Sequence, residues 1–348
     1  MAEPTPGART HRLRVVEVIA ETADAHSLVL QAPPESADRF AYRPGQFLTL
    51  KLPGADGRPA ARCYSLASSP HTGEPLKITV KRVAGGYGSN WVCDRLAAGD
   101  ELEVLPPAGT FTPDSLDGDL LLVAGGSGIT PVLSIAKSAL AGGRGRVVLL
   151  YANRDESSVV FRDELRALSR DHPHRLLTVH WLESLQGLPS VDGLAAALAP
   201  YAGREAFVCG PQPLMDAVEQ ALRTLGTPGD RIHRERFFSL GADVFDAPAV
   251  PVDPAAAGGA SAEVELDGET HTVAWPAAAP LLDVLLAAGV DAPYSCREGA
   301  CSACTCRVVA GEVKMLRNDV LDEQDVAEGY VLACQALPLT DRVEITYS

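Results

Sequence analysis

Long hydrophobic runs are absent from this sequence of 348 residues, in which no stretch approaches the roughly 18 consecutive apolar residues of a membrane-spanning helix. The first ten residues also lack the apolar segment of a secretory signal. We therefore expect a cytoplasmic protein with no membrane contact. In such a protein the eight cysteines are better explained as free thiols or metal ligands than as a disulfide framework.

Positive charge is scarce, because 30 Lys and Arg face 45 Asp and Glu and leave a net charge of −15. That balance argues against a nucleic-acid partner. The excess of acidic residues is unevenly distributed along the chain. From Ser261 onward, 15 acidic and 5 basic residues give a charge of −10, which is two-thirds of the net charge of the whole sequence. This acidic C-terminal part is either a solvated surface or a docking face for a basic partner, whose approach the charge would steer.

Several common site motifs are missing as well. The eight histidines form neither an H-E-x-x-H nor a C-x-H motif, so we assign none of them to a metal. No Ser–His–Asp arrangement can be recognised from the spacing. The charges between Arg162 and Arg170 fit the solvent-exposed face of a helix.

The length favours two or three domains, and the sequence pattern divides the chain accordingly. Residues 9–115 carry short, partly alternating apolar runs separated by Pro and Gly, which predicts a closed antiparallel β-barrel. In residues 116–240 apolar runs alternate with helical segments, which predicts an α/β domain with a parallel sheet. Residues 241–261 are rich in Ala, Pro and Gly and predict a linker, and a second β-rich unit follows at 262–348.

Three cysteines in this last unit stand at C-x4-C-x2-C spacing, and a fourth follows after the length of a strand and a loop. They are Cys296, Cys301, Cys304 and Cys334. This is the ligand pattern of a plant-type [2Fe–2S] cluster. A structural zinc site is the alternative, but such sites usually have two C-x2-C pairs and only one is present here. We expect Cys63, Cys93 and Cys306 to be packed thiols.

A glycine-rich turn, Gly125–Pro131, follows the apolar run Leu120–Ala124 and opens a predicted helix. Glycines there let the backbone approach a diphosphate, and a helix N-terminus favours an anion. A tight structural turn is the alternative, because the sequence is not the full G-x-G-x-x-G motif.

A second candidate is Arg62–Ser65, with the sequence R-C-Y-S. An Arg can bind a phosphate with two donors, a Tyr can pack on a flat ring, and a Ser hydroxyl can bond a ring nitrogen. Without context, this stretch would be an amphipathic strand. Gly85–Ser89 is a further possible anion site, with Lys81 and Arg82 just before it.

Together with Pro44–Phe47 and Cys209-Gly210-Pro211, these stretches resemble the ferredoxin–NADP reductase superfamily across residues 11–240. Ala262–Tyr347 resembles a plant-type ferredoxin of β-grasp fold. The resemblance implies a multidomain protein, with an FAD-binding barrel, then a nicotinamide-binding α/β domain, then a cluster-binding domain.

The resemblance also implies roles for single residues. The residues expected at FAD are Arg62, Tyr64, Ser65, Lys81, Gly88, Ser89 and Phe237. Those expected at the nicotinamide nucleotide are Gly126, Gly128, Thr130, Arg154, Cys209 and Gly210. The catalytic candidates are Ser65, Cys209 and Glu235. Ser65 and Cys209 are expected to support hydride transfer by positioning and not by acid–base chemistry. Glu235 is expected to close the flavin site. Cys296, Cys301, Cys304 and Cys334 would bind the iron atoms.

A reductase followed by a ferredoxin resembles the reductase components of bacterial oxygenases. Two subgroups compete, the reductases of 3-ketosteroid 9α-hydroxylase and of phenylacetyl-CoA epoxidase. The stretches Arg62–Glu74, Tyr151–Glu156 and Val179–Pro189 look more like the former. The resemblance then implies a monomer that passes electrons from NADH through FAD and the cluster to a Rieske-type terminal oxygenase in steroid degradation. The oxygenase, and not this chain, would bind the steroid. The reductase of another oxygenase and a non-enzymatic redox carrier or sensor stay open as alternatives.

The choice of nicotinamide depends on the stretch Asn153–Glu156. Arg154 could meet the 2′-phosphate of NADPH, but Asp155 and Glu156 would repel it. NADH is therefore favoured, with NADPH possible. The linker composition also suggests that the ferredoxin unit docks alternately on the flavin domain and on a partner.

Overall fold

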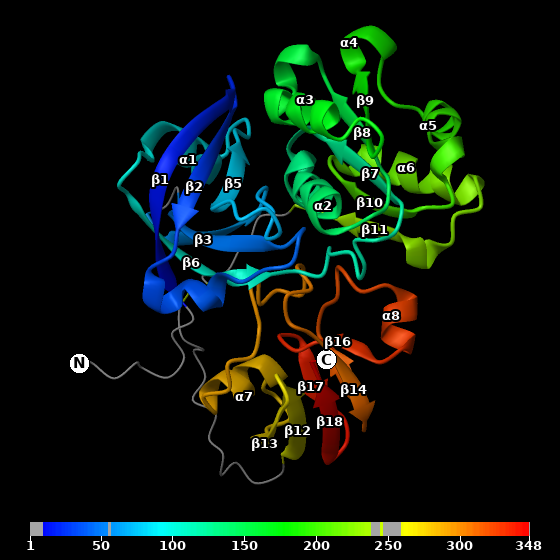
Figure 1. The fold of residues 1–348 in the computed structure, drawn as a ribbon. Coiled ribbons are helices and arrows are strands. Elements are labelled where there is room, and N and C mark those ends of the chain that lie inside the picture. The colour runs from blue at the N-terminus through cyan, green and yellow to red at the C-terminus, as the bar shows by residue number, and fades with distance from the viewer. Residues whose placement is uncertain (1–9, 55–56, 238–243, 246–258, 348) are drawn as a thin grey trace.

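The computed structural model describes residues 10–54, 57–237, 244–245 and 259–347, and it contains three domains (Figure 1). Most of the expected linker, including 246–258, lies outside the described residues. Within the described ranges, no helix combines the length and the apolar character needed to cross a membrane.

The first domain is the predicted antiparallel barrel, in the order β4-β3-β6-β1-β2-β5. Its strands are β1 (His11–Thr22), β2 (Ala25–Gln31), β3 (Phe47–Pro53), β4 (Pro59–Ser65), β5 (Leu76–Lys81) and β6 (Glu101–Ala108). A bridge between Leu66 and Ile78 links the end of β4 to β5 and closes the sheet on itself. The short helix η1 (Pro34–Phe40) and helix α1 (Tyr87–Arg95) complete the domain.

Strand β3 has two different buried faces. Leu48 and Leu50 point into the barrel core, as expected from the period of two along a strand. Phe47, on the other face, belongs to a different core that it shares with the C-terminal domain. The outer face of the barrel is therefore a domain interface at this strand.

The second domain is the predicted parallel sheet, in the order β11-β10-β7-β8-β9. The strands are β7 (Leu120–Gly125), β8 (Val147–Asn153), β9 (Leu176–Leu182), β10 (Glu205–Cys209) and β11 (Ile232–Glu235). The helices are α2 (Ile129–Gly142), α3 (Arg162–Asp171), α4 (Glu183–Gln186), α5 (Val191–Leu198) and α6 (Gln212–Thr224), with short turns η2 (Gly126–Gly128), η3 (Glu156–Ser158), η4 (Ala199–Tyr201) and η5 (Gly229–Arg231). The sequence pattern did not predict β11, which is short and polar.

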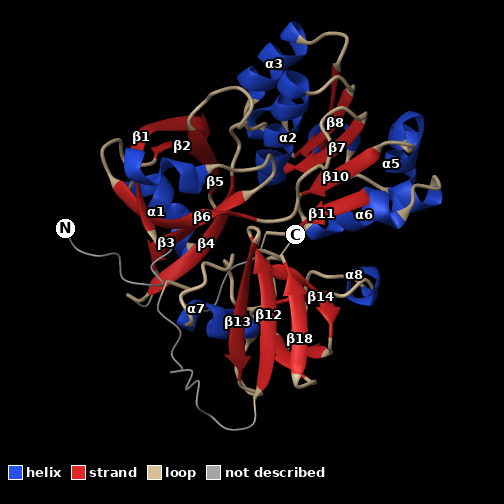
Figure 2. Cartoon of the chain, turned by 60° about the horizontal axis from the view of Figure 1, so that its bottom comes forward, coloured by secondary structure: helices blue, strands red, loops and turns tan. Residues whose placement is uncertain are grey.

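Each face of this sheet is covered by its own helices. Alternate residues of β7 pack with α2 and α3 on one side and with α5 and α6 on the other (Figure 2). Strands buried on both faces read as continuous apolar runs, which explains why β7 and β8 could be recognised from the sequence.

The third domain has a mixed sheet in the order β13-β12-β18-β14-β16, in which only β12 and β18 pair in parallel. Its elements are β12 (Ala260–Leu266), β13 (Glu269–Trp275), α7 (Leu281–Ala287), β14 (Thr305–Ala310), β15 (Val313–Met315), α8 (Glu323–Ala327), β16 (Tyr330–Leu332), β17 (Ala336–Pro338) and β18 (Arg342–Thr346). Strand β12 begins at Ala260, two residues before the expected start of this domain.

The third domain is docked on the barrel and is not held by the linker alone. The two domains are neighbours in Figure 1, and one apolar core joins Ala61 and Leu105 of the barrel with Trp275 of the C-terminal domain. At the rim, the Arg39 guanidinium pairs with the Asp291 carboxylate at 2.5 Å.

Candidate functional site

The four cysteines of the C-terminal motif lie together. Cys296, Cys301 and Cys304 come from the loop between α7 and β14, and Cys334 from the turn between β16 and β17; none is more than 6% exposed. The Cys296 sulfur accepts backbone N–H bonds from Glu298 and Ala300, each 3.3 Å long. These bonds stabilise a thiolate, the form that binds metal.

Contacts among the sulfurs act in the same direction. Hydrogen bonds from Cys301 and Cys334 lower the pKa of the Cys296 thiol well below its usual value. Gly299 has a φ of 76°, and a Cβ there would lie 2.8 Å from the carbonyl oxygen of Arg317. Only glycine fits this close passage of the loop.

No three His, Cys, Asp or Glu side chains of the described residues are grouped around one point as for a single metal ion. A [2Fe–2S] cluster does not need such a group, because its four cysteines are divided between two irons. Four buried cysteines with amide donors at the sulfur therefore fit a two-iron cluster. Cys306 packs nearby and is 2% exposed, and burial raises the pKa of its thiol.

The expected FAD residues on β4 point to two sides of the strand. Arg62 lies beside the start of α1, since a Cβ on Gly88 would be 3.7 Å from the Arg62 Cγ. The N–H groups of the first helical turn, which includes Gly88 and Ser89, lack acceptors within the helix. A guanidinium and the positive end of a helix both attract an anion, and a diphosphate would suit this position.

The Ser89 side chain has a structural task. Its hydroxyl accepts a hydrogen bond of 3.0 Å from the Val83 amide and so fixes the loop that enters α1. The Lys81 ammonium pairs with Asp24 at 3.7 Å. Tyr64 packs against the barrel core.

The three candidates for the hydride step converge, although they come from both domains. Cys209 and Glu235 are partners in the pairing of β10 with β11. The Ser65 hydroxyl donates to the Glu235 carboxylate at 3.4 Å. Burial raises the pKa of Glu235 to about 8, which the hydrogen bond from Ser65 opposes only in part. Phe237, two residues further, is 48% exposed.

Burial and the nearby Glu235 carboxylate also raise the pKa of the Cys209 thiol, which is fully buried. At neutral pH this site therefore holds a neutral acid and a neutral thiol. That arrangement suits positioning, because neither group carries a charge that would oppose hydride transfer.

The glycine-rich turn packs directly on the end of β10. A Cβ on Gly128 would lie 2.2 Å from the Cys209 carbonyl oxygen, and one on Gly210 would lie 2.9 Å from the Gly125 nitrogen. These glycines are needed for packing. Gly126 differs, because it has a φ of 53° and its Cβ position faces open space. Thr130 is buried and its hydroxyl donates to the Ser127 carbonyl at 3.0 Å.

Asn153, at the carboxyl end of β8, begins the stretch expected to select the nicotinamide, but it was given no role of its own there. It is 8% exposed, and neither its amide nitrogen nor its amide oxygen has a hydrogen-bond partner among the described residues. Buried polar groups are nearly always paired in native proteins. At the same edge of the sheet as the Gly126 turn, an unpaired amide fits the polar atoms of a bound nucleotide.

The two charged residues after Asn153 have partners within the chain. The Arg154 guanidinium pairs with Asp24 at 3.6 Å. The Asp155 carboxylate accepts hydrogen bonds from Ser157 and Ser158, and these hydroxyls lower its pKa. Asp155 therefore keeps its negative charge at this edge.

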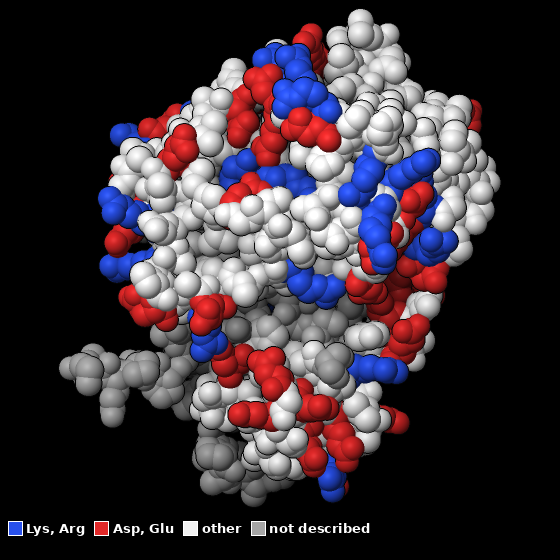
Figure 3. Space-filling model, viewed as in Figure 1, with Lys and Arg blue, Asp and Glu red and all other residues white. Residues whose placement is uncertain are grey.

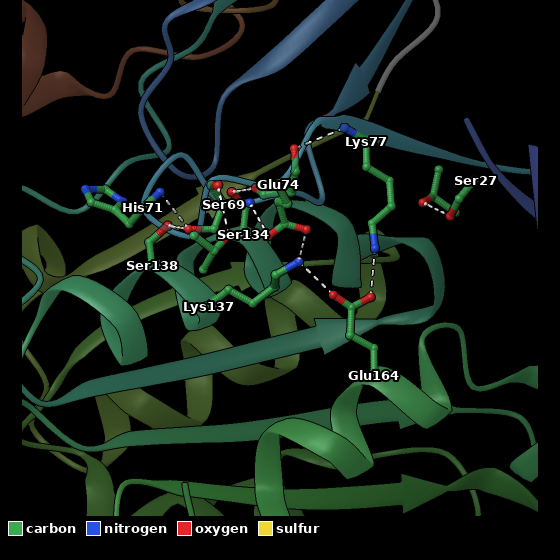
Figure 4. Close-up of polar contacts among 12 residues, drawn as sticks. Ser27, Ser69, His71, Glu74, Lys77, Ser134, Lys137, Ser138 and Glu164 are labelled. Carbon is green, nitrogen blue, oxygen red and sulfur yellow. Dashed lines mark hydrogen bonds and ion pairs between the residues drawn. The ribbon is translucent and has the colours of Figure 1, made fainter. Parts of the chain in front are cut away.

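A network of ion pairs and hydroxyl bonds joins the barrel to the second domain, and sequence reasoning missed it (Figure 4). The Lys137 ammonium, whose side chain is 7% exposed, lies 2.5 Å from the Glu74 carboxylate and 2.7 Å from that of Glu164. Lys77 pairs with Glu164 at 2.8 Å. We call Glu74, Lys77, Lys137 and Glu164 the domain-bridging network, since the first two belong to the barrel and the last two to α2 and α3.

Comparison with known proteins identifies three domain families along the chain. A model of the oxidoreductase FAD-binding domain matches residues 12–112, the oxidoreductase NAD-binding domain matches 122–220, and the 2Fe-2S iron-sulfur cluster binding domain matches 264–339. The structure of phthalate dioxygenase reductase superposes with a TM-score of 0.56 at 27% identity, covering 97% of this chain and 98% of that one. The predicted fold class is thus confirmed for all three domains.

Relatives of known function are similar over the whole chain. The ferredoxin reductase component of 3-ketosteroid-9-alpha-monooxygenase from Rhodococcus rhodochrous is 57% identical over 98% of both chains. A component of the 1,2-phenylacetyl-CoA epoxidase of Escherichia coli is 37% identical over 97% of both. The resemblance predicted from the motifs is confirmed. The chain belongs to the family of oxygenase reductase components that unite FAD-binding, NAD-binding and [2Fe–2S] domains in one polypeptide.

Proposed function

We propose that this chain is the reductase component of a 3-ketosteroid 9α-hydroxylase and delivers electrons from NADH to its terminal oxygenase. The observation that supports this choice is the 57% identity, over nearly the full length of both chains, to a reductase component of that system. The identity to the epoxidase component is 37% over a similar length. The three domains fit an electron path in either case, so the partner is what distinguishes the two functions.

When bound, the nicotinamide supplies a hydride, the flavin divides the electron pair, and the iron–sulfur cluster passes on single electrons. The protein holds these groups. Arg62 and the first turn of α1 would bind the FAD diphosphate. Gly126, Thr130 and Asn153 would bind the nucleotide, and the four cysteines would bind the irons.

Glu235, Ser65 and Cys209 would order the place where nicotinamide and flavin meet. Because the pKa of Glu235 is about 8, its carboxyl group is mostly protonated at neutral pH. It then presents a neutral group to the Ser65 hydroxyl. We infer that the three residues position the reacting rings and exclude water. None of them is proposed to act as a general acid or base in the hydride transfer.

NADH is the proposed donor, because of the charges after β8. Arg154 is already paired with Asp24, and Asp155 is held in its charged form. The Asp155 carboxylate would repel the 2′-phosphate of NADPH, and the Arg154 guanidinium is already engaged by Asp24. Comparing kcat/KM for NADH and NADPH tests this, and a clear preference for NADPH would contradict it.

The partner is proposed to dock on the acidic surface of the third domain. In Figure 3 Asp and Glu side chains gather over this domain. Around α8 the exposed acidic residues are Asp319, Asp322, Glu323 and Glu328. A basic face on the oxygenase would be attracted, and the encounter would slow as salt rises. We propose that the reductase itself acts as a monomer.

The experiment that tests the proposed function compares partners. The purified chain, NADH and oxygen are mixed in parallel with a 3-ketosteroid 9α-oxygenase and its steroid, and with the oxygenase components of a phenylacetyl-CoA epoxidase and their substrate. We expect product with the former at the higher rate. Faster turnover with the epoxidase would overturn the proposal in favour of the second candidate.

A further inference from the structure

Cys63 and the proposed site residue Ser65 lie on the same face of strand β4. They are two positions apart, which is about 7 Å along a strand. Ser65 contacts Glu235 at the place proposed for hydride transfer. Cys63 instead contacts the third domain, where its sulfur lies 3.5 Å from the hydroxyl of Ser295.

Ser295 directly precedes the cluster ligand Cys296. Its hydroxyl also bonds that of Thr49, on the neighbouring strand β3, at 2.7 Å, and the Thr49 hydroxyl lies 3.6 Å from the Cys63 sulfur. Thr49 and Ser295 are each 1% exposed. The three side chains thus form a closed polar contact between the flavin-binding strand and the cluster loop.

The surrounding interface fixes this contact. Phe47 and Ala61 of the barrel lie in one apolar core with the cluster cysteines. On the other side of the loop, the Ser302 hydroxyl lies 3.0 Å from that of Thr110. Ser302 stands between two of the ligands, so the loop is held before its first cysteine and again before its third.

We propose that the Thr49–Cys63–Ser295 contact positions the cluster loop on the flavin-binding strand and so sets the separation across which electrons pass from flavin to cluster. This inference rests on the proposed electron path. According to this inference, electrons pass from flavin to cluster while the third domain is docked on the barrel as in this structure. Thr49 and Ser295 are positioning residues, since they touch no expected cofactor atom but hold the segment that does.

The test uses the full-length holoprotein and the variants Thr49→Val and Ser295→Ala. The barrel offers a matched control, because Ser27 and Thr79 form a buried hydroxyl pair at 2.7 Å within one domain. Thr79→Val therefore removes the same kind of bond without touching the interface. Thr49→Ser keeps the hydroxyl and should restore the contact.

Anaerobic rapid mixing with NADH separates flavin reduction from cluster reduction by their absorption bands. We expect flavin reduction to keep its rate in all variants. Cluster reduction should slow by up to about fivefold in Thr49→Val and Ser295→Ala, the factor by which one lost hydrogen bond weakens the docked arrangement. Thr79→Val and Thr49→Ser should follow the wild type. Unchanged cluster reduction in both interface variants would overturn the inference.

Hydrogen exchange gives a second readout that needs no electron transfer. Amides in 47–53 and 291–302 should exchange faster in the two interface variants than in the wild type or in Thr79→Val, because the domains separate more often. Equal exchange would refute the positioning role. If the wild-type cluster is not reduced by NADH at all, the proposed function fails, while the exchange data still decide on the contact.

Discussion

Replacing Lys137 by Met tests whether the domain-bridging network holds the first two domains together. Met keeps most of the length of the side chain but removes the ammonium. The carboxylates of Glu74 and Glu164 then face each other without the cation that separates them. Lys77 still neutralises part of the charge on Glu164.

The expected magnitude follows from burial. Removing one partner of a fully buried ion pair costs about 3–5 kcal/mol. The Glu74 and Glu164 side chains are 24% and 28% exposed, so water screens part of the repulsion. We therefore expect a loss of about 2–3 kcal/mol, which lowers the midpoint of thermal unfolding of the two domains by about 4–12 °C.

Release of FAD fluorescence on heating measures this midpoint. Lys51→Met is the matched control, because Lys51 pairs with Glu103 at 3.2 Å while its side chain is 30% exposed, and such pairs contribute about 0–1 kcal/mol. If Lys137→Met unfolds at the same temperature as Lys51→Met, the network does not stabilise the domain contact and the reasoning is refuted.

The network also has a predictable pH dependence. Burial by itself would raise the pKa of Glu164, but the charges of Lys77 and Lys137 outweigh it and lower the pKa below its usual value. A lowered carboxyl pKa stabilises the fold above the unfolded value of about 4.3, and this stabilisation is lost as pH falls through the folded value. The difference between Lys137→Met and the wild type should therefore shrink at acid pH.

Three further predictions concern the sites. Flavin reduction by NADH should decline above about pH 8 as Glu235 ionises, and Glu235→Gln should remove this decline; a pH profile that keeps it would assign the ionisation to another group. Gly128→Ala should destabilise the second domain and weaken NADH binding in a fluorescence titration, since its Cβ would lie 2.2 Å from the Cys209 carbonyl oxygen. Oxygenase turnover at limiting partner concentration should fall as salt rises, and a rate that ignores salt would contradict docking on the acidic surface.

Sequence patterns predicted the features that are local. The apolar runs of the parallel sheet, the glycine turn and the spacing of Cys296, Cys301 and Cys304 each depend on neighbouring residues, and all could be recognised. Strand β11 was missed, because a run of four residues at a sheet edge, three of them polar, resembles a loop.

Contacts between distant segments could not be predicted in this way. Thr49 and Ser295 are 246 positions apart, and Glu74 and Lys137 are 63 apart. Glu164 was assigned to a solvent-exposed helix face, where its charge fits the pattern, but it bonds two lysines across a domain interface. An amphipathic pattern reports how polar a face is and not which partner covers it.

The proposed function is tested most directly by the stoichiometry of the complete system. Purified chain, NADH, oxygen, the 3-ketosteroid oxygenase and its steroid are combined, and NADH consumed is compared with 9α-hydroxylated steroid formed. We predict one product molecule for each NADH, with no product when the reductase is omitted. Consumption of NADH without hydroxylated steroid would contradict the claim that this chain delivers its electrons to that oxygenase.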